Sequence, residues 1–220
     1  MDTHTTINQF DLTELFFSNC EHRKKICDQL HGDNLRVEAI TLICCHMEAL
    51  ATFVYQARGK GYSKAFCRLL ADYGDNDIFN KIHPGYLIKQ IENNGRIKGE
   101  DKKNIIEALR RLAGATQDIE DVKRAILSPT TDKAKKWIEK YLYMGTFAHI
   151  IYDFVRSRSV HHGEENIINI EEILHNGSTV PRIDYRFLSE TYESLLKNFR
   201  EACNSSGKDP YKFVSQQEYM

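Results

Sequence analysis

The fold is indicated most strongly by residues 137–163, which read WIEKYLYMGTFAHIIYDFVRSRSVHHG. Apolar side chains recur in this stretch at alternating spacings of four and three, at Trp137, Tyr141, Met144, Ala148, Ile151 and Val155. This spacing is the period of one face of an α-helix. Further apolar residues beside the stripe widen this face, as is typical of a helix at the centre of a bundle. We therefore predict one long helix over about residues 132–161.

The rest of the chain also carries mostly helical patterns. Apolar periodicity, capping residues and breaks predict helices at about residues 12–30, 34–58, 63–73, 100–113, 118–127 and 184–203, with an interrupted fragment at 78–92. A β-prone pattern is found near residues 166–183, where two such runs flank the hairpin signal His175-Asn176-Gly177. The predicted fold class is therefore all-α, a helical bundle with a short β-hairpin-like segment near residues 166–183.

Length and composition suggest a soluble protein of one domain. The 220 residues are enough for one well-buried domain. We expect an N-terminal segment at residues 1–11, a helical domain at 12–203, and a polar, loosely held tail at 204–220. No signal-peptide pattern opens the chain, and no run approaches the roughly 18 apolar residues that a membrane span needs. We therefore expect a cytoplasmic protein with no membrane partner.

Charge and cysteine usage narrow the classes of binding site. The net charge of −1 gives no overall basic field, so a nucleic-acid site would have to be a local patch. The basic stretch from Lys98 to Arg124 is either a solvated face or a track for phosphates. None of the six cysteines forms a C-x-x-C pair, so we expect buried, reduced thiols rather than a zinc site.

The polar end of the long apolar stretch carries the chemistry-bearing residues. Arg156, Arg158, His161 and His162 fall within seven residues. A histidine with a pKa near 6.5 can take a proton from a ribose 2′-hydroxyl, which then attacks the adjacent phosphate. An arginine can stabilise the charge that develops, and DNA would be spared because it lacks the nucleophile. The other interpretation is a helix end whose arginines pair with acids and whose histidines cap carbonyls.

Helix geometry leaves the partners within this cluster open. Residues five apart on an α-helix differ by about 140° in direction. Arg156 and His161 therefore converge only if the helix loosens, if the arginine reaches across, or if a second subunit completes the site. Arg158 faces His161 and His162 more naturally. Asp153, three residues before Arg156, can orient its guanidinium by a charge-assisted hydrogen bond.

The sequence Arg156-Ser157-Arg158-Ser159-Val160-His161-His162-Gly163 resembles the R-x4-6-H motif of HEPN domains. The matching features are the arginine, the small polar residue after it, the aliphatic residue before the histidine, and the following glycine. The segment from Arg36 to Leu50, with Glu48 in an apolar run, resembles the early helix of that family. The family fold would cover roughly residues 12–203, with 60–130 as a family-specific insertion.

This resemblance implies a metal-independent endoribonuclease that needs no cofactor and leaves 2′,3′-cyclic phosphate ends. Such proteins often act as toxins or antiviral effectors, and two subunits typically form a composite active site. RNA would be the substrate, a homodimer the active form, and an antitoxin or activator a further partner. Arg156 and His161 would be the catalytic pair, supported by Ser157, Arg158, His162, Asp153 and Glu48.

Two alternatives to the nuclease stay open at this point. Ser157 stands where many active HEPN domains carry asparagine, aspartate or histidine, and the family also contains inactive members. The chain could therefore be a catalytically silent HEPN-like module that binds nucleic acid or a protein partner. A purely structural helical domain is the third interpretation. Glu48 is either an acid near the arginines or a salt-bridged surface residue.

Overall fold

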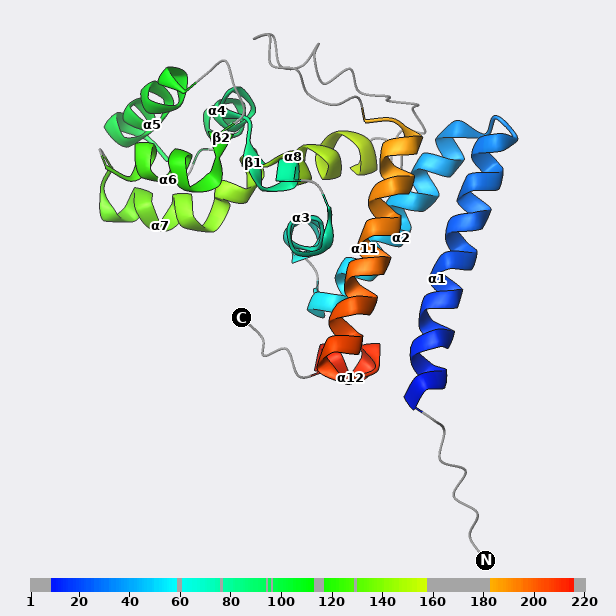
Figure 1. The fold of residues 1–220 in the computed structure, drawn as a ribbon. Helices are drawn as coiled ribbons and strands as arrows, with labels where there is room; N and C mark the ends of the chain where they lie inside the picture. The colour runs from blue at the N-terminus through cyan, green and yellow to red at the C-terminus, as the bar shows by residue number, and fades with distance from the viewer. Residues whose placement is uncertain are drawn as a thin grey trace, which may run out of the picture. The chain divides into compact units, whose positions relative to one another are not determined.

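The computed structural model describes residues 9–58, 61–75, 77–93, 95, 97–112, 117–128, 130–157 and 183–215. These residues are almost entirely helical, which confirms the all-α fold class (Figure 1). The described chain divides into two compact units. Unit 1 holds the residues up to Asp75 and those from Tyr185 onward, and unit 2 holds those between. This division replaces the single domain that was expected over 12–203.

The described residues of unit 1 form five helices: α1 (Gln9–Gly32), α2 (Arg36–Tyr55), α3 (Tyr62–Tyr73), α11 (Tyr185–Ser206) and α12 (Pro210–Ser215). Helix α2 packs against α1, α3 and α11, and α1 runs beside α11 (Figure 1). The central position of α2 follows from its apolar stripe, which buries Ala39, Ile40, Ile43, Cys44, Met47, Leu50, Ala51 and Val54.

Helix α2 also corrects one expectation from the sequence. It is long and apolar enough to cross a membrane by length and composition, with a mean hydropathy of 1.6. The core helix of a soluble protein has the same composition, and the buried residues of α2 contribute to the core of unit 1. None of the six cysteines forms a disulfide, and five of them are buried, as the sequence predicted.

The residues after 203 are more ordered than the sequence predicted. Helix α11 continues to Ser206, and α12 packs against α1, α2 and α11. Asp209 begins α12, because its Oδ1 accepts hydrogen bonds from the backbone N–H groups of Tyr211 and Lys212. Val214 is buried. The prediction of a loosely held tail is therefore wrong for residues 204–214.

Unit 2 is built from shorter elements. They are η2 (Asp77–Asn80), β1 (Lys81–Ile82), α4 (Pro84–Asn93), α5 (Gly99–Arg111), β2 (Gln117–Asp118), α6 (Ile119–Leu127), α7 (Asp132–Tyr141), η3 (Leu142–Gly145), α8 (Phe147–Ile150) and the π-helix η4 (Ile151–Arg156). Strands β1 and β2 pair antiparallel. Thr131 caps α7, because its side chain accepts a hydrogen bond from the backbone N–H of Ala134. The expected insertion at 60–130 does not match this division, because α3 belongs to unit 1.

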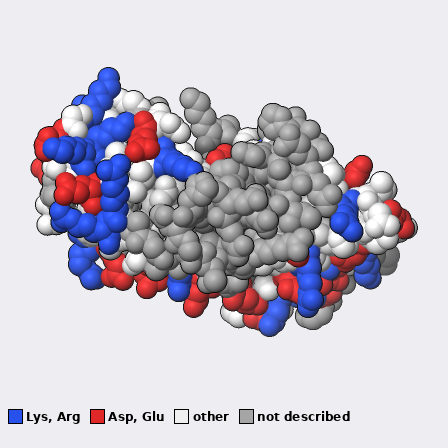
Figure 2. Space-filling view, turned by 90° about the horizontal axis from the view of Figure 1, so that it is seen from above, with Lys and Arg blue, Asp and Glu red and all other residues white. Residues whose placement is uncertain are grey.

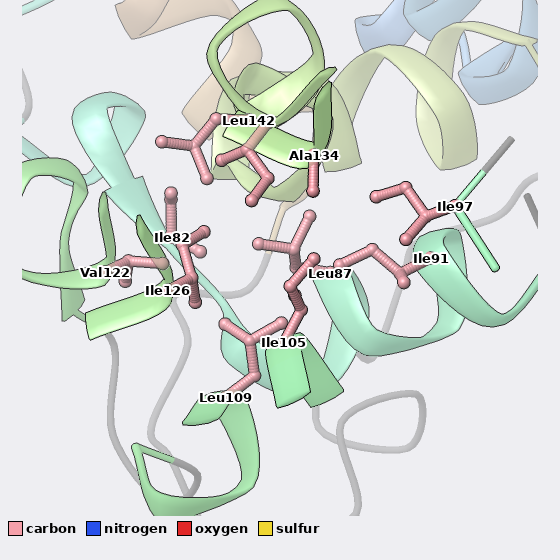
Figure 3. Packing of buried hydrophobic residues seen from close by; sticks show 11 residues of the cluster. Ile82, Leu87, Ile91, Ile97, Ile105, Leu109, Val122, Ile126, Ala134 and Leu142 are labelled. Atoms are coloured by element: carbon pink, nitrogen blue, oxygen red, sulfur yellow. The ribbon is translucent and has the colours of Figure 1, made fainter. Parts of the chain in front are cut away.

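The core of unit 2 is aliphatic. Figure 3 shows the side chains of α4, α5 and α6 pointing toward one another and toward the α7–η3 segment. The cluster consists of Ile82, Leu87, Ile91, Ile97, Ile105, Leu109, Val122, Ile126, Ala134, Ile138 and Leu142. Their amphipathic spacing on α5, α6 and α7 explains why these short helices need one another to bury their apolar faces.

The long helix predicted over 132–161 is instead interrupted at residues 142–146. A Cβ added to Gly145 would lie 2.9 Å from the Cβ of Leu87, so this glycine allows a close approach of α4. The Gly145 carbonyl accepts a hydrogen bond from the backbone N–H of His83. Thr146 is extended, and its Oγ1 accepts from the backbone N–H of His149 to begin α8. The helical period of the sequence persists because each piece still buries its apolar face. The predicted hairpin near 166–183 lies outside the described residues except for Ile183.

Candidate functional site

The structure describes part of the predicted catalytic cluster. Arg156 ends η4, Ser157 follows it, and both side chains are half-buried in unit 2. Glu48 is half-buried in α2 of unit 1. The remaining predicted residues, Arg158, His161 and His162, lie outside the described residues.

Arg156 stands at the end of a π-helical segment. The backbone N–H of Ser157 bonds to the carbonyl of Tyr152, five residues earlier, and Ser157 Oγ donates to the same oxygen at 3.1 Å. In a π-helix the hydrogen bonds join residues five apart, where an α-helix joins residues four apart. Such turns are rare in proteins, and those that occur are often found at functional sites. The helix therefore departs from α geometry in the turn that leads to Arg156.

Asp153 is held from a different element than expected. The hydroxyl of Tyr86, in α4, donates to Asp153 Oδ2 at 2.7 Å. The Arg156 guanidinium carbon lies 5.3 Å from the centre of the Tyr152 ring, within cation–π range. The sequence predicted that Asp153 would orient Arg156 directly. In the structure the hydrogen bond to Asp153 comes from Tyr86, and the ring of Tyr152 flanks the guanidinium.

His149, in α8, is a buried side chain just before η4. It is 7% exposed and is surrounded by the rings of Tyr86, Tyr143 and Tyr152, whose centres lie 5.5 to 6.4 Å from its own. Its Nδ1 atom has no hydrogen-bond partner within the described structure. Burial lowers the pKa of His149, while the negative charge of Asp153 raises it less. His149 is therefore a neutral side chain at pH 7, and it is too buried to contact an RNA.

His83 organises the start of α4. Its Nδ1 accepts a hydrogen bond from the backbone N–H of Tyr86 at 3.1 Å. Nδ1 can accept only in the neutral ring with its proton on Nε2. Burial lowers the pKa of His83 to about 4, which keeps the ring neutral. The signal was present as His83-Pro84, because proline is favoured at the first position of a helix.

These contacts form a continuous connection between α4 and η4. The backbone of His83 bonds to Gly145, its ring bonds to the backbone of Tyr86, and the hydroxyl of Tyr86 bonds to Asp153. Arg156 is therefore a half-buried arginine at the end of a π-helical turn. Ser157 holds this turn from within η4, and Tyr86 holds it from α4. An arginine held in this way can bind a phosphate or another anion through its planar fork.

The basic stretch between Lys98 and Arg124 does not form an uninterrupted positive track. Three of its cations pair with acids on their own helices: Arg111 with Glu107, Lys123 with Glu120, and Arg124 with Asp121. Lys102 donates to the carbonyl of Glu92. At the left of Figure 2, where α5 lies, blue and red side chains are interspersed. This pattern favours a solvated, charge-paired face.

Cysteine, histidine and carboxylate side chains do not gather into a metal-binding group of three or more anywhere in the described part of the chain. No protein-family model matches the chain, and comparisons with curated proteins and with solved structures find no match either. Its function has therefore to be argued from its own residues.

Proposed function

We propose that this protein is a cytoplasmic, metal-independent endoribonuclease of the HEPN type, acting as a homodimer with a composite active site. The observation that carries the proposal is the position of Arg156, the arginine of the R-x4-6-H motif. It ends a π-helical turn that Ser157 closes and that Tyr86 braces through Asp153. A rare turn type at the motif arginine is what a functional site would have, and a simple helix end would not need it.

In this proposal the two motif residues divide the chemistry. His161 takes the proton from a ribose 2′-hydroxyl, and the freed oxygen attacks the neighbouring phosphorus. Arg156 stabilises the negative charge on the phosphate oxygens as the bond to the 5′-oxygen breaks. The products are a 2′,3′-cyclic phosphate and a 5′-hydroxyl. Arg158 would be a second phosphate contact and His162 an alternative base.

The test is cleavage of a labelled single-stranded RNA in excess EDTA. Wild type should produce 2′,3′-cyclic phosphate ends, and His161→Ala should lower the rate by about a hundredfold or more. Arg156→Ala should have an effect of similar size, because it removes the charge that stabilises the transition state. His22→Ala is the matched control, since His22 is an exposed histidine on α1. An RNA with a single 2′-deoxy position should resist cleavage at that position.

The main alternative, a catalytically silent binding module, predicts a different result. Wild type would then bind RNA or a protein partner without cutting any RNA, including in the presence of cell extract as a source of activator. A role as a toxin or antiviral effector adds a cellular expectation. Expression of wild type should arrest growth and degrade RNA, and expression of His161→Ala should do neither.

A further inference from the structure

We infer that Tyr86 is a positioning residue of the proposed site, which orients Arg156 by holding Asp153 and with it the π-helical register of η4. The inference rests on the proposed function for its catalytic consequence. Its structural half, that Tyr86 selects the register of η4, stands on contacts between described residues of unit 2.

Tyr86 is suited to this role because it is itself held rigidly. It is 2% exposed, and its backbone N–H is bound by the ring of His83. The next residue, Leu87, packs against Gly145 so closely that a Cβ would not fit there. The Tyr86 hydroxyl therefore has a fixed position, and a hydrogen bond to a carboxylate is roughly twice as strong as one between neutral groups.

The residues of η4 could form either a π-helical or an α-helical turn. An α-helical turn would join residues four apart, and changing the register by one residue would rotate Arg156 by about 100°. Two interactions favour the π register: the Ser157 hydroxyl bonds to the carbonyl of Tyr152, and Tyr86 fixes Asp153. Without the second, the direction of the Arg156 side chain is no longer specified from α4.

A packing role for Tyr86 can be separated from a positioning role by substitution. The Tyr86 ring packs beside His149, with ring centres 6.2 Å apart, and phenylalanine keeps this contact. Tyr86→Phe therefore removes the hydroxyl and its bond to Asp153 while keeping this ring contact. Asp153→Asn keeps an acceptor oxygen for Tyr86, whereas Asp153→Ala removes it. Tyr55→Phe is the matched control, because Tyr55 makes a similar bond, 2.6 Å long, to Asp72 in unit 1.

The experiment combines RNA cleavage kinetics with amide hydrogen exchange of the full-length protein. In Tyr86→Phe we expect kcat to fall about ten- to a hundredfold, as for a misplaced catalytic group, with KM within twofold. Exchange of the Ser157 amide should accelerate at least about tenfold in the same variant, because the turn that protects it opens more often. Asp153→Asn should retain most activity, and Asp153→Ala should resemble Tyr86→Phe without adding to it. Tyr55→Phe should change neither quantity.

The outcomes test separately whether Tyr86 selects the register of η4 and whether that register matters for RNA cleavage. Unchanged exchange at Ser157 in Tyr86→Phe would overturn the inference, whether or not the protein cuts RNA. Faster exchange with unchanged kcat would also overturn it, because the register would then not orient the arginine. If wild type cuts no RNA, the proposed function fails, and the exchange data alone decide whether Tyr86 selects the register.

Discussion

The two units of this protein differ in how some of their polar groups are paired. In unit 1 a polar centre is fully paired: Asp28 accepts hydrogen bonds from Lys24, Tyr185 and Ser189, at 2.8 to 3.1 Å. Partial burial raises the pKa of Asp28, but these hydrogen bonds lower it overall. Among the described residues, the buried Nδ1 of His149 and Nε1 of Trp137, both in unit 2, have no hydrogen-bond partner. In unit 1 the buried Oδ2 of Asp209 also lacks a hydrogen bond, but it lies 3.3 Å from the Lys212 ammonium.

This difference coincides with a difference in helix regularity. Unit 1 has long α-helices around a continuous apolar core, whereas the chain of unit 2 breaks at Gly145 and then forms a π turn. Irregular backbone and unsatisfied buried groups both cost stability, and proteins usually retain them where function needs them. The irregular backbone from Gly145 to η4 therefore agrees with the site that we propose at Arg156.

The largest effect is expected from removing a side chain that several helices of unit 1 contact. Phe199 is fully buried and contacts the rings of Phe17, Tyr73 and Phe213, from three other segments of unit 1. Phe199→Ala should lower the free energy of unfolding by about 3–5 kcal/mol. Circular dichroism during chemical denaturation measures this loss. Leu15→Ala, at an exposed position, should change it by less than about 0.5 kcal/mol. A small effect of Phe199→Ala would mean that the core of unit 1 is not continuous.

A second test uses the titration of His83 in unit 2. The pKa of His83 is about 4 in the folded state and near 6.5 when unfolded, so the unfolded state binds a proton first as the pH falls. This contribution to stability is complete above about pH 6.5. It is lost at about 1.4 kcal/mol per pH unit down to about pH 4.

The fluorescence of Trp137, the only tryptophan, reports unfolding of unit 2 directly. His83→Asn keeps a capping acceptor but does not titrate, so its stability should depend less on pH between 6.5 and 4. Some dependence should remain, because the pKa of His149 is also lowered. Identical pH profiles for wild type and His83→Asn would show that His83 is not buried as a neutral cap.

The smallest expected effect belongs to the polar centre of unit 1. Tyr185→Phe removes one of the hydrogen bonds to Asp28 and keeps the ring stacked on His31, whose centre is 4.4 Å away. We expect a loss of about 1–2 kcal/mol in the free energy of unfolding. Tyr62→Phe, at an exposed site, is the control. A loss above about 3 kcal/mol would contradict this expectation. It would mean that the remaining hydrogen bonds from Lys24 and Ser189 do not satisfy Asp28.

Sequence patterns predicted those features that depend on neighbouring residues. The helices α1, α2, α5, α6 and α11 were all expected within a few residues of their observed ends. The break at Gly145 was missed because it depends on the approach of Leu87, which is distant in sequence. The contact between α12 and the start of the chain was missed for the same reason.

The candidate site was predicted in part. The sequence identified Arg156, Ser157 and Asp153, but the partner of Asp153 is Tyr86, 67 residues earlier. Only α4, anchored through His83, brings that hydroxyl to η4. The π turn was not predicted, because apolar periodicity does not distinguish the two hydrogen-bond registers. The loosening that the sequence suggested lies between Arg156 and His161, and residues 158–161 are outside the described ones. The roles of Arg158, His161 and His162 stay predictions.

The discontinuity of unit 1 has a consequence for synthesis on the ribosome. Roughly 110 residues lie between the end of α3 and the start of α11, and they take about 5–20 s to translate at usual rates. During this interval the nascent chain already contains α1, α2 and α3, with Phe17 still lacking Phe199. Most of unit 2 emerges before unit 1 can be completed. Helices α1, α2 and α3 are therefore the part of the nascent chain whose apolar side chains most need protection by a chaperone.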